Sequence, residues 1–195
     1  MAPELTPQAS RILDRAQALI AAGGYNGFSY ADVSVDVGIT KASIHHHFPK
    51  KSDLVRTLLE RYRAAAVDGM AALRANIPGA DRQLRAYADW WATCISDASM
   101  PICICAMLGA ELPALPDEVA SEVHAHFAFL GGWLESVIAT GAADGVFQLR
   151  ITPAAEAQAF MATVHGAMLS ARALGDPSLF KSIVDATLRR LTAVA

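Results

Sequence analysis

The chain has 195 residues, of which 53% are hydrophobic and 18% charged, and its formal net charge is −3. High hydrophobicity with a low net charge excludes a largely disordered chain, and the length suits one or two domains with a substantial core. The longest stretch without a charged residue, residues 16–31, contains three glycines. A bilayer-spanning helix needs about 20 mostly apolar residues, so we expect no membrane segment and no membrane partner.

Residues 1–10 lack the basic and apolar regions of a secretory signal, and three cysteines are too few for a disulfide framework. We therefore expect a cytoplasmic protein. Charge is unevenly distributed, since residues 1–63 carry eight basic and six acidic side chains and residues 64–195 carry eight and thirteen. This favours contact with a polyanion at the N-terminal end, although ordinary fluctuation in composition explains the difference equally well.

Apolar residues recur with helical spacing along almost the whole chain, and no segment reads convincingly as a strand. A first helix carries the stripe Ile12 to Ile20 and ends at Gly23 or Gly24. The other eight expected helices cover residues 29–38, 40–48, 51–76, 81–97, 101–112, 117–140, 153–174 and 177–193. The fold class predicted is all-α, with about nine helices.

Residues 28–55 carry the most informative pattern. Two short helices separated by Gly38 form a helix-turn-helix, because glycine is favoured where a turn needs a positive φ. The apolar positions of this segment have the spacing to pack it against the first helix, namely Val33, Val37, Ile39, Ile44 and Phe48. The other face of the second short helix then carries polar and small residues, and a helix fits the major groove of DNA.

The Gly38 turn, the helix ending in His47-Phe48 and the following Lys51 resemble the DNA-binding domain of the tetracycline-repressor (TetR/AcrR) family of bacterial transcriptional regulators. The resemblance implies a three-helix DNA-binding domain over residues 1–50. A helical ligand-binding and dimerisation domain, residues 51–195, would follow and begin with the linking helix. The function implied is a ligand-responsive regulator, a repressor that a small-molecule inducer releases from a palindromic operator in double-stranded DNA.

The resemblance also implies individual DNA contacts. Tyr30 matches a phosphate contact at the start of the first short helix, and Lys51 matches a phosphate contact at the start of the linking helix. His45 stands where the family usually has tyrosine. The full set of expected DNA contacts is Tyr30, Thr40, Lys41, Ala42, Ser43, His45, His46, His47 and Lys51.

The run of three histidines also invites a metal-site interpretation. Neighbouring residues on a helix point about 100° apart, so His45, His46 and His47 do not have the geometry to bind one ion together. We therefore expect no metal and no cofactor.

Aromatic, histidine and sulfur-containing residues concentrate in the C-terminal domain, where the family binds its inducers. Such residues at helical spacing lie in an ordinary core about as often as in a pocket. The expected ligand-binding residues are Trp90, Trp91, Cys94, Cys103, Met107, His124, Phe127, Trp133, Met161 and His165.

The last two expected helices are rich in alanine and glycine, which let helices approach closely. The resemblance implies a homodimer through residues 153–193, and a twofold dimer reads a roughly palindromic site. A monomer with an alanine-rich core is the alternative.

Two other function classes remain as alternatives. A cysteine-dependent enzyme would use Cys103 or His165, but the chain lacks the usual hydrolase, metalloprotease and phosphate-loop motifs, so we expect no enzyme. A helical adaptor without DNA binding would leave residues 28–55 unexplained.

Cys103 supports a further hypothesis. The stretch from Cys103 to Glu111 is similar to a segment in one branch of the family, which includes N-ethylmaleimide-reductase repressors. With Pro101 as the first helical residue, Cys103 would lie in a helical first turn, which stabilises a thiolate. Cys103 would then sense electrophiles or oxidants, and a buried, inert cysteine is the alternative.

Overall fold

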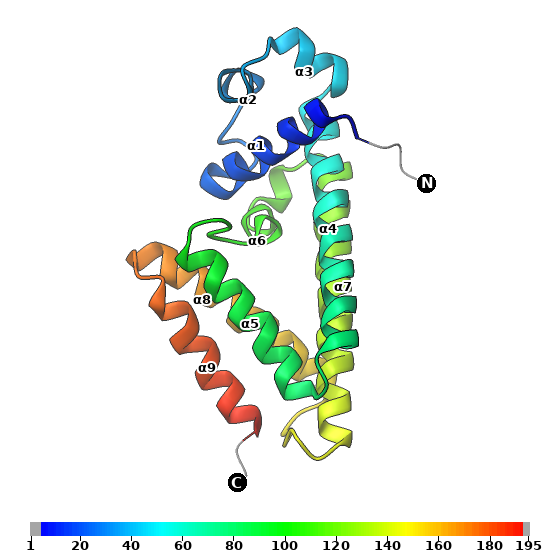
Figure 1. Cartoon of the computed structure of the whole chain (residues 1–195), viewed down its shortest axis with the longest axis vertical. Helices are drawn as coiled ribbons and strands as arrows, with labels where there is room; N and C mark the ends of the chain where they lie inside the picture. The colour runs from blue at the N-terminus through cyan, green and yellow to red at the C-terminus, as the bar shows by residue number, and fades with distance from the viewer. Residues whose placement is uncertain (1–4, 193–195) are drawn as a thin grey trace. The chain divides into compact units, whose positions relative to one another are not determined.

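The computed structural model describes residues 5–192, and within this range it contains α-helices, one short 3-10 helix and no strand. The prediction of an all-α fold with about nine helices is therefore confirmed (Figure 1). In chain order the elements are α1 (Pro7–Gly23), α2 (Tyr30–Val37), α3 (Lys41–His47), α4 (Lys51–Asn76), α5 (Ala80–Ser96), α6 (Ile104–Gly109), η1 (Leu112–Ala114), α7 (Asp117–Ala143), α8 (Pro153–Leu174) and α9 (Ser178–Thr192). Within residues 5–192, no helix combines the length and apolar character that crossing a membrane requires.

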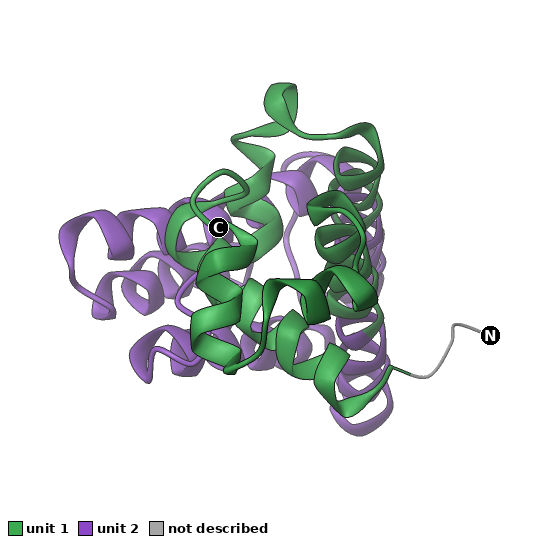
Figure 2. Cartoon of the chain, turned by 90° about the horizontal axis from the view of Figure 1, so that it is seen from above, with its two compact units in different colours: residues 1–64, 104–126 green, residues 65–103, 127–195 purple. Residues whose placement is uncertain are grey.

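Contacts divide the chain into two compact units, shown in different colours in Figure 2. Unit 1 comprises residues 1–64 and 104–126, and unit 2 comprises residues 65–103 and 127–195. The domain boundary at residue 50 rests on the sequence pattern and stays a prediction. The last residue of the predicted dimer segment, residue 193, lies outside the described residues.

Local side-chain bonds define the helices at the N-terminal end of unit 1. Ser29 and Asp32 form a capping box at the start of α2, in which the Ser29 backbone N–H donates to the Asp32 carboxylate over 2.7 Å. Gly38 ends α2 in the left-handed conformation, with φ 72°. The Thr40 hydroxyl then accepts from the Ser43 N–H and starts α3. The sequence predicts this turn because its signals are all local.

The core of unit 1 is built from one apolar face of each helix. α1 packs against α2 and against α6, and α2 packs against α3. The fully buried side chains include Ile12, Leu13, Ile20, Ile44, Leu54, Leu58, Leu59, Ile104 and Leu108. Burying a side chain of this kind contributes about 1.5–3 kcal/mol, so this core fixes α2 and α3 on α1 and the start of α4.

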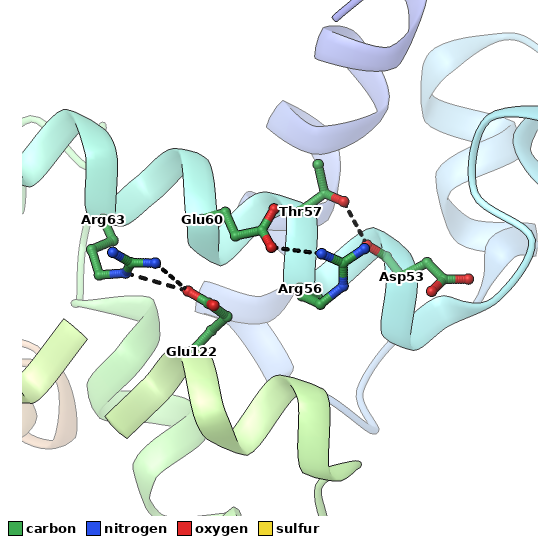
Figure 3. Close-up of polar contacts among 6 residues, drawn as sticks. All are labelled: Asp53, Arg56, Thr57, Glu60, Arg63 and Glu122. Atoms are coloured by element: carbon green, nitrogen blue, oxygen red, sulfur yellow. Dashed lines mark hydrogen bonds and ion pairs between the residues drawn. The ribbon is translucent and has the colours of Figure 1, made fainter. Parts of the chain in front are cut away.

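Ion pairs along α4 reinforce unit 1 (Figure 3). Arg63 of α4 binds Glu122 of α7 with its Nη2 at 2.9 Å from the carboxylate, and Arg56 pairs with Glu60 one turn along α4. Both pairs are partly exposed, so each contributes at most about 1 kcal/mol. The Arg63–Glu122 pair aligns α4 with the first turns of α7 more than it stabilises them.

Unit 2 is a helical layer in which α9 packs against both α5 and α8. Its buried side chains come from these helices and from the second part of α7, and include Leu84, Leu134, Phe160, Val164, Met168, Phe180 and Val184. Glu156 is a buried carboxylate in this unit, and its Oε1 lies 2.5 Å from Nη2 of Arg190. This pair links α8 to α9.

The segment before α6 differs from the sequence prediction. We expected a helix over residues 101–112 with Pro101 as its first residue, but α6 begins at Ile104 and ends at Gly109. Residues 101–103 form a bend and irregular chain, and Leu112–Ala114 form a separate 3-10 turn. A proline is also suited to a bend, so its presence alone does not locate a helix start.

Candidate DNA-binding and ligand-binding sites

The exposed face of α3 carries most of the residues predicted to contact DNA. Thr40, Lys41, Ala42, His45 and His46 are exposed, and Ser43 and His47 are half-buried. Ile44 on the opposite face is fully buried in the core of unit 1. The structure therefore brings seven of the nine predicted residues together along one short, solvent-facing helix and its cap.

A glutamine of α1 holds two of these residues. Nε2 of Gln8 lies 3.4 Å from the hydroxyl of Ser43, and Oε1 of Gln8 lies 3.2 Å from Nε2 of His47. The second contact is a hydrogen bond when His47 carries its proton on Nε2. Gln8 thus fixes the orientation of α3 relative to α1, a role that the sequence pattern did not indicate.

Tyr30 is buried, and its hydroxyl donates to the carbonyl of Phe48 over 2.8 Å. Burial, followed by the charge of Asp53, raises the pKa of Tyr30 well above its usual value, so the phenol stays protonated. The ring also lies edge-on to His45, with 4.7 Å between ring centroids. The side chain therefore ties the start of α2 to the end of α3.

Replacing Tyr30 with phenylalanine is expected to lower the free energy of unfolding by about 1–3 kcal/mol, because the buried Phe48 carbonyl loses its donor. The salt dependence of DNA binding should stay unchanged, since the hydroxyl is committed to an internal bond. Urea denaturation and a salt titration of DNA affinity measure the two effects. A salt slope reduced by about one would contradict this and would make the hydroxyl a phosphate contact.

Lys51, the first residue of α4, is directed into unit 1. Its ammonium donates to the carbonyl of Phe28 and lies 4.0 Å from the centroid of the Phe28 ring and 4.8 Å from that of Tyr25. Burial lowers the pKa of Lys51, while the charges of Asp32 and Glu111 act in the opposite direction. In this structure Lys51 joins the turn before α2 to α4, and the phosphate contact implied by the resemblance stays a prediction.

Glu111 makes a second link between distant parts of unit 1. Its two carboxylate oxygens lie 3.2 Å and 3.1 Å from the backbone N of Tyr25, which donates to them. Gly24 makes this approach possible, because a Cβ on Gly24 would overlap the carboxylate. The turn after α6 is thereby bonded to the turn after α1, next to the ring that lies under Lys51.

The residues predicted to bind a ligand are divided between the two units. Met107 and His124 belong to unit 1, whereas the other eight belong to unit 2. Trp90 and His124 are exposed, and Phe127 and His165 are half-buried with 5.2 Å between their ring centroids. Trp91, Cys94, Cys103, Trp133 and Met161 are buried.

An aromatic cluster occupies the interior of unit 2. The rings of Tyr87 and Trp133 lie with their centroids 5.6 Å apart, and Trp91 follows Tyr87 by one helical turn on α5. Burial is the main cause that raises the pKa of Tyr87. Tyr87 was not among the predicted residues, because an aromatic at a core position of α5 gives no separate signal.

Unit 2 also has a groove with a volume of about 760 Å³, and no residue of the aromatic cluster lines it. Its walls are the second half of α5 and the start of α9, with Asp89, Thr93, Asp97, Asp176 and Lys181 among the lining residues. Lys181 pairs with Asp89 across it at 2.9 Å. No residue predicted to bind ligand lines this groove.

The exposed face of α8 carries a stripe of small and apolar residues. Its members recur at intervals of three, four or seven residues, which places them along one side of the helix: Ala155, Ala159, Ala162, Gly166, Leu169 and Ala173. Leu169 is 59% exposed, and Leu174 at the end of the helix is 73% exposed. A continuous apolar stripe of this kind is typical of a surface that another chain covers.

All three cysteines, Cys94, Cys103 and Cys105, are buried and form no disulfide within residues 5–192. Cys103 is 1% exposed and precedes the first residue of α6, so the predicted position inside a helical first turn is wrong. Its burial separates the thiol from reagents in solution, and the sensor hypothesis stays a prediction.

We expect iodoacetamide to alkylate these cysteines at least about a hundredfold more slowly in the native protein than in urea, because reaction requires local opening. Mass spectrometry of time-resolved samples measures each rate. Rapid modification of Cys103 alone in the native protein would contradict this expectation and support the sensor hypothesis.

Comparisons with known proteins agree with this architecture. Residues 12–58 match the family model of bacterial regulatory proteins of the tetR family, and residues 79–187 match the C-terminal domain of tetracyclin repressor-like proteins. No curated protein matches the chain.

Solved structures extend the comparison over almost the whole chain. A TetR family transcriptional regulator from Agrobacterium tumefaciens is 53% identical, covers 95% of this chain and 98% of its own, and superposes with a TM-score of 0.93. A TetR regulator from Legionella pneumophila is 24% identical over 96% and 99% of the two chains, with a TM-score of 0.86. The reduced form of NemR from E. coli, 18% identical over 96% and 100% of the chains, shares the fold with a TM-score of 0.80.

Together, the matched models cover both the helix-turn-helix and the C-terminal helices, and the identity with the Agrobacterium regulator extends through both. The fold, the family resemblance and the transcription-regulator class predicted from the sequence are confirmed. The chain belongs to the TetR family of transcriptional regulators.

Proposed function

We propose that the chain is a repressor that binds a palindromic DNA operator as a homodimer and leaves it when a small molecule binds the C-terminal helices. The observation that carries this proposal is the exposed polar face of α3, held by the Thr40 cap and by Gln8 against a fully buried opposite face. A short helix fixed in this way enters the major groove with its first residues at the base edges.

The residues on this face divide into two roles. Lys41, Ala42 and Ser43 at the start of α3 read base edges, and His45 and His46 lie further along the same helix. Phosphate contacts come from the end of the motif, where lysines follow α3. Lys50 is exposed there. Its backbone N–H donates to the Asp53 carboxylate over 3.1 Å, so its side chain is the group that contacts a phosphate.

Dimerisation supports the palindromic operator. The exposed apolar stripe of α8 needs a cover, and a twofold axis through it places two copies of α3 in one complex. Regulators of this family bind operators, dimerise and respond to small ligands. The enzyme and adaptor alternatives explain neither the α3 face nor this stripe.

Alanine variants separate the two kinds of DNA contact. Lys41→Ala should change the preferred base at one position of each half-site, at a cost of about 1–3 kcal/mol. The Lys51 ammonium turns from the Phe28 carbonyl to a phosphate when DNA binds, so Lys51→Ala should weaken binding to every sequence alike and reduce the salt slope by about one. Arg150→Ala, which removes one exposed positive charge from unit 2 outside residues 153–193, is the control and should change neither quantity.

The proposal is tested by selecting duplexes that bind the full chain from a random pool, with affinity then measured at several salt concentrations. We expect a twofold-symmetric sequence bound at least about a thousandfold more tightly than random DNA. Enrichment of no sequence, or of a sequence without twofold symmetry, would refute it.

A further inference from the structure

The aromatic cluster of unit 2 contains two polar groups that the protein itself does not satisfy. The indole N–H groups of Trp91 and Trp133 are both buried and have no hydrogen-bond partner within residues 5–192. The side chains are 4% and 8% exposed, so bulk water does not reach them freely. Native proteins leave few buried polar groups unpaired, and two in one small cluster are unusual.

Tyr87 is a neighbour of both tryptophans. Its ring contacts Trp133, and Trp91 opposes the burial-driven rise in the pKa of Tyr87, which places the Trp91 N–H toward the phenol. The two groups do not reach hydrogen-bond geometry, since the Trp91 N–H remains without a partner. The cluster therefore offers two unused donors beside aromatic faces.

The chemistry of these groups restricts what binds there. An indole N–H donates and never accepts, so the complementary group is an acceptor such as an oxygen atom. The faces of Tyr87, Trp91 and Trp133 favour a flat, aromatic body. A quaternary ammonium ion suits aromatic faces but has no acceptor for the two donors.

The interior of unit 2 also offers no buried cation, because no lysine or arginine among residues 5–192 is buried. A carboxylate bound there would lose its hydrating water and gain no cation as a partner, which is energetically costly. The acceptor is therefore an uncharged carbonyl rather than an anion.

We propose that Trp91, Trp133 and Tyr87 bind a neutral aromatic molecule that carries a carbonyl oxygen, with the indole N–H groups donating to that oxygen. The inference rests on the proposed ligand-responsive function and names the chemical class of the ligand. Cys103, which is also buried in unit 2, is among the groups that influence the pKa of Tyr87.

The test uses four aromatic probes with the full-length protein. 9-Fluorenone carries the carbonyl, fluorene lacks it, fluorene-9-carboxylate is an anion, and phenyltrimethylammonium is a cation. Isothermal titration calorimetry should show 9-fluorenone binding about tenfold more tightly than fluorene, with the anion and the cation weaker still.

Conservative variants locate the site. Trp91→Phe and Trp133→Phe keep an aromatic ring and remove one donor each, so the preference for 9-fluorenone over fluorene should fall toward unity in at least one of them. Tyr62→Phe is the matched control, because it also keeps an aromatic ring and removes one donor, but it lies on α4 in unit 1, outside the cluster. It should keep the full preference. Circular dichroism and thermal unfolding verify that each variant is folded.

Equal affinity for fluorenone and fluorene would overturn the inference, as would tighter binding of either charged probe or a preference that survives in both variants. Operator affinity without any probe is measured on the same preparations. Intact operator binding with no carbonyl preference means that this inference fails and the proposed function stands. Carbonyl-selective binding without operator binding means that this inference holds and the proposed function fails.

Discussion

A Gly166→Asp variant is expected to be monomeric at micromolar concentration and to bind a two-half-site operator about a thousandfold more weakly. Gly166 lies in the exposed stripe of α8, and a Cβ added there meets no atom within 4 Å in the single chain. The fold of the chain should therefore tolerate the change. In a twofold dimer the substitution buries two carboxylates, each without a cation, at several kcal/mol per charge. Two separate chains bind the half-sites independently, without the increase in affinity of about 100- to 10,000-fold that linking two binding sites provides.

Gly69→Asp is the matched control for this variant. Gly69 is exposed on α4, and a Cβ there also meets no atom within 4 Å. The Gly69→Asp variant carries the same substitution in the middle of a helix, outside the proposed interface, and should remain dimeric. Sedimentation velocity measures the assembly state and fluorescence anisotropy the DNA affinity. A dimeric Gly166→Asp protein with normal operator affinity would place the interface elsewhere.

A Gly24→Ala variant is expected to lose about 2.5–6 kcal/mol in the free energy of unfolding. Gly24 has φ 74° and ψ −168°, a region that is essentially restricted to glycine and costs other residues about 1–3 kcal/mol. The new methyl group also displaces Glu111 from the Tyr25 N–H, which removes a hydrogen bond to a charged group worth about 1.5–3 kcal/mol.

Gly23→Ala provides the control one residue earlier. Gly23 ends α1, its φ is not positive, and a Cβ there meets no atom within 4 Å, so alanine should be neutral or slightly stabilising. Chemical denaturation at one fixed protein concentration compares the variants, because the stability of a dimer depends on concentration. Equal stability of the two alanine variants would show that the Glu111 contact does not hold the turn.

The helix-turn-helix was predictable because its signals are local. The Ser29 and Asp32 capping box, Gly38 at positive φ and the Thr40 cap each act within a few residues. The apolar spacing then assigns the buried face. The exposure of Lys41, Ala42 and His46 follows from that spacing, without any knowledge of the tertiary contacts.

The contacts that position these residues were not predictable, because they join parts of the chain far apart in sequence. Glu111 and Tyr25 are 86 residues apart, and Gln8 and His47 are 39 apart. Lys51 fits a phosphate contact by its place at a helix start, but only the packed structure shows its ammonium at the Phe28 carbonyl. A single buried tyrosine such as Tyr87 has no pattern that separates it from the core.

The proposal that two α3 helices of one dimer read adjacent grooves is tested most directly by hydroxyl-radical footprinting on the selected operator, with the stoichiometry determined in parallel. We predict an even number of chains per duplex. The protected segments should be related by twofold symmetry, and their centres should be one helical turn, about 34–36 Å, or a multiple of it apart. A single chain per duplex, or one continuous asymmetric footprint, would contradict the account.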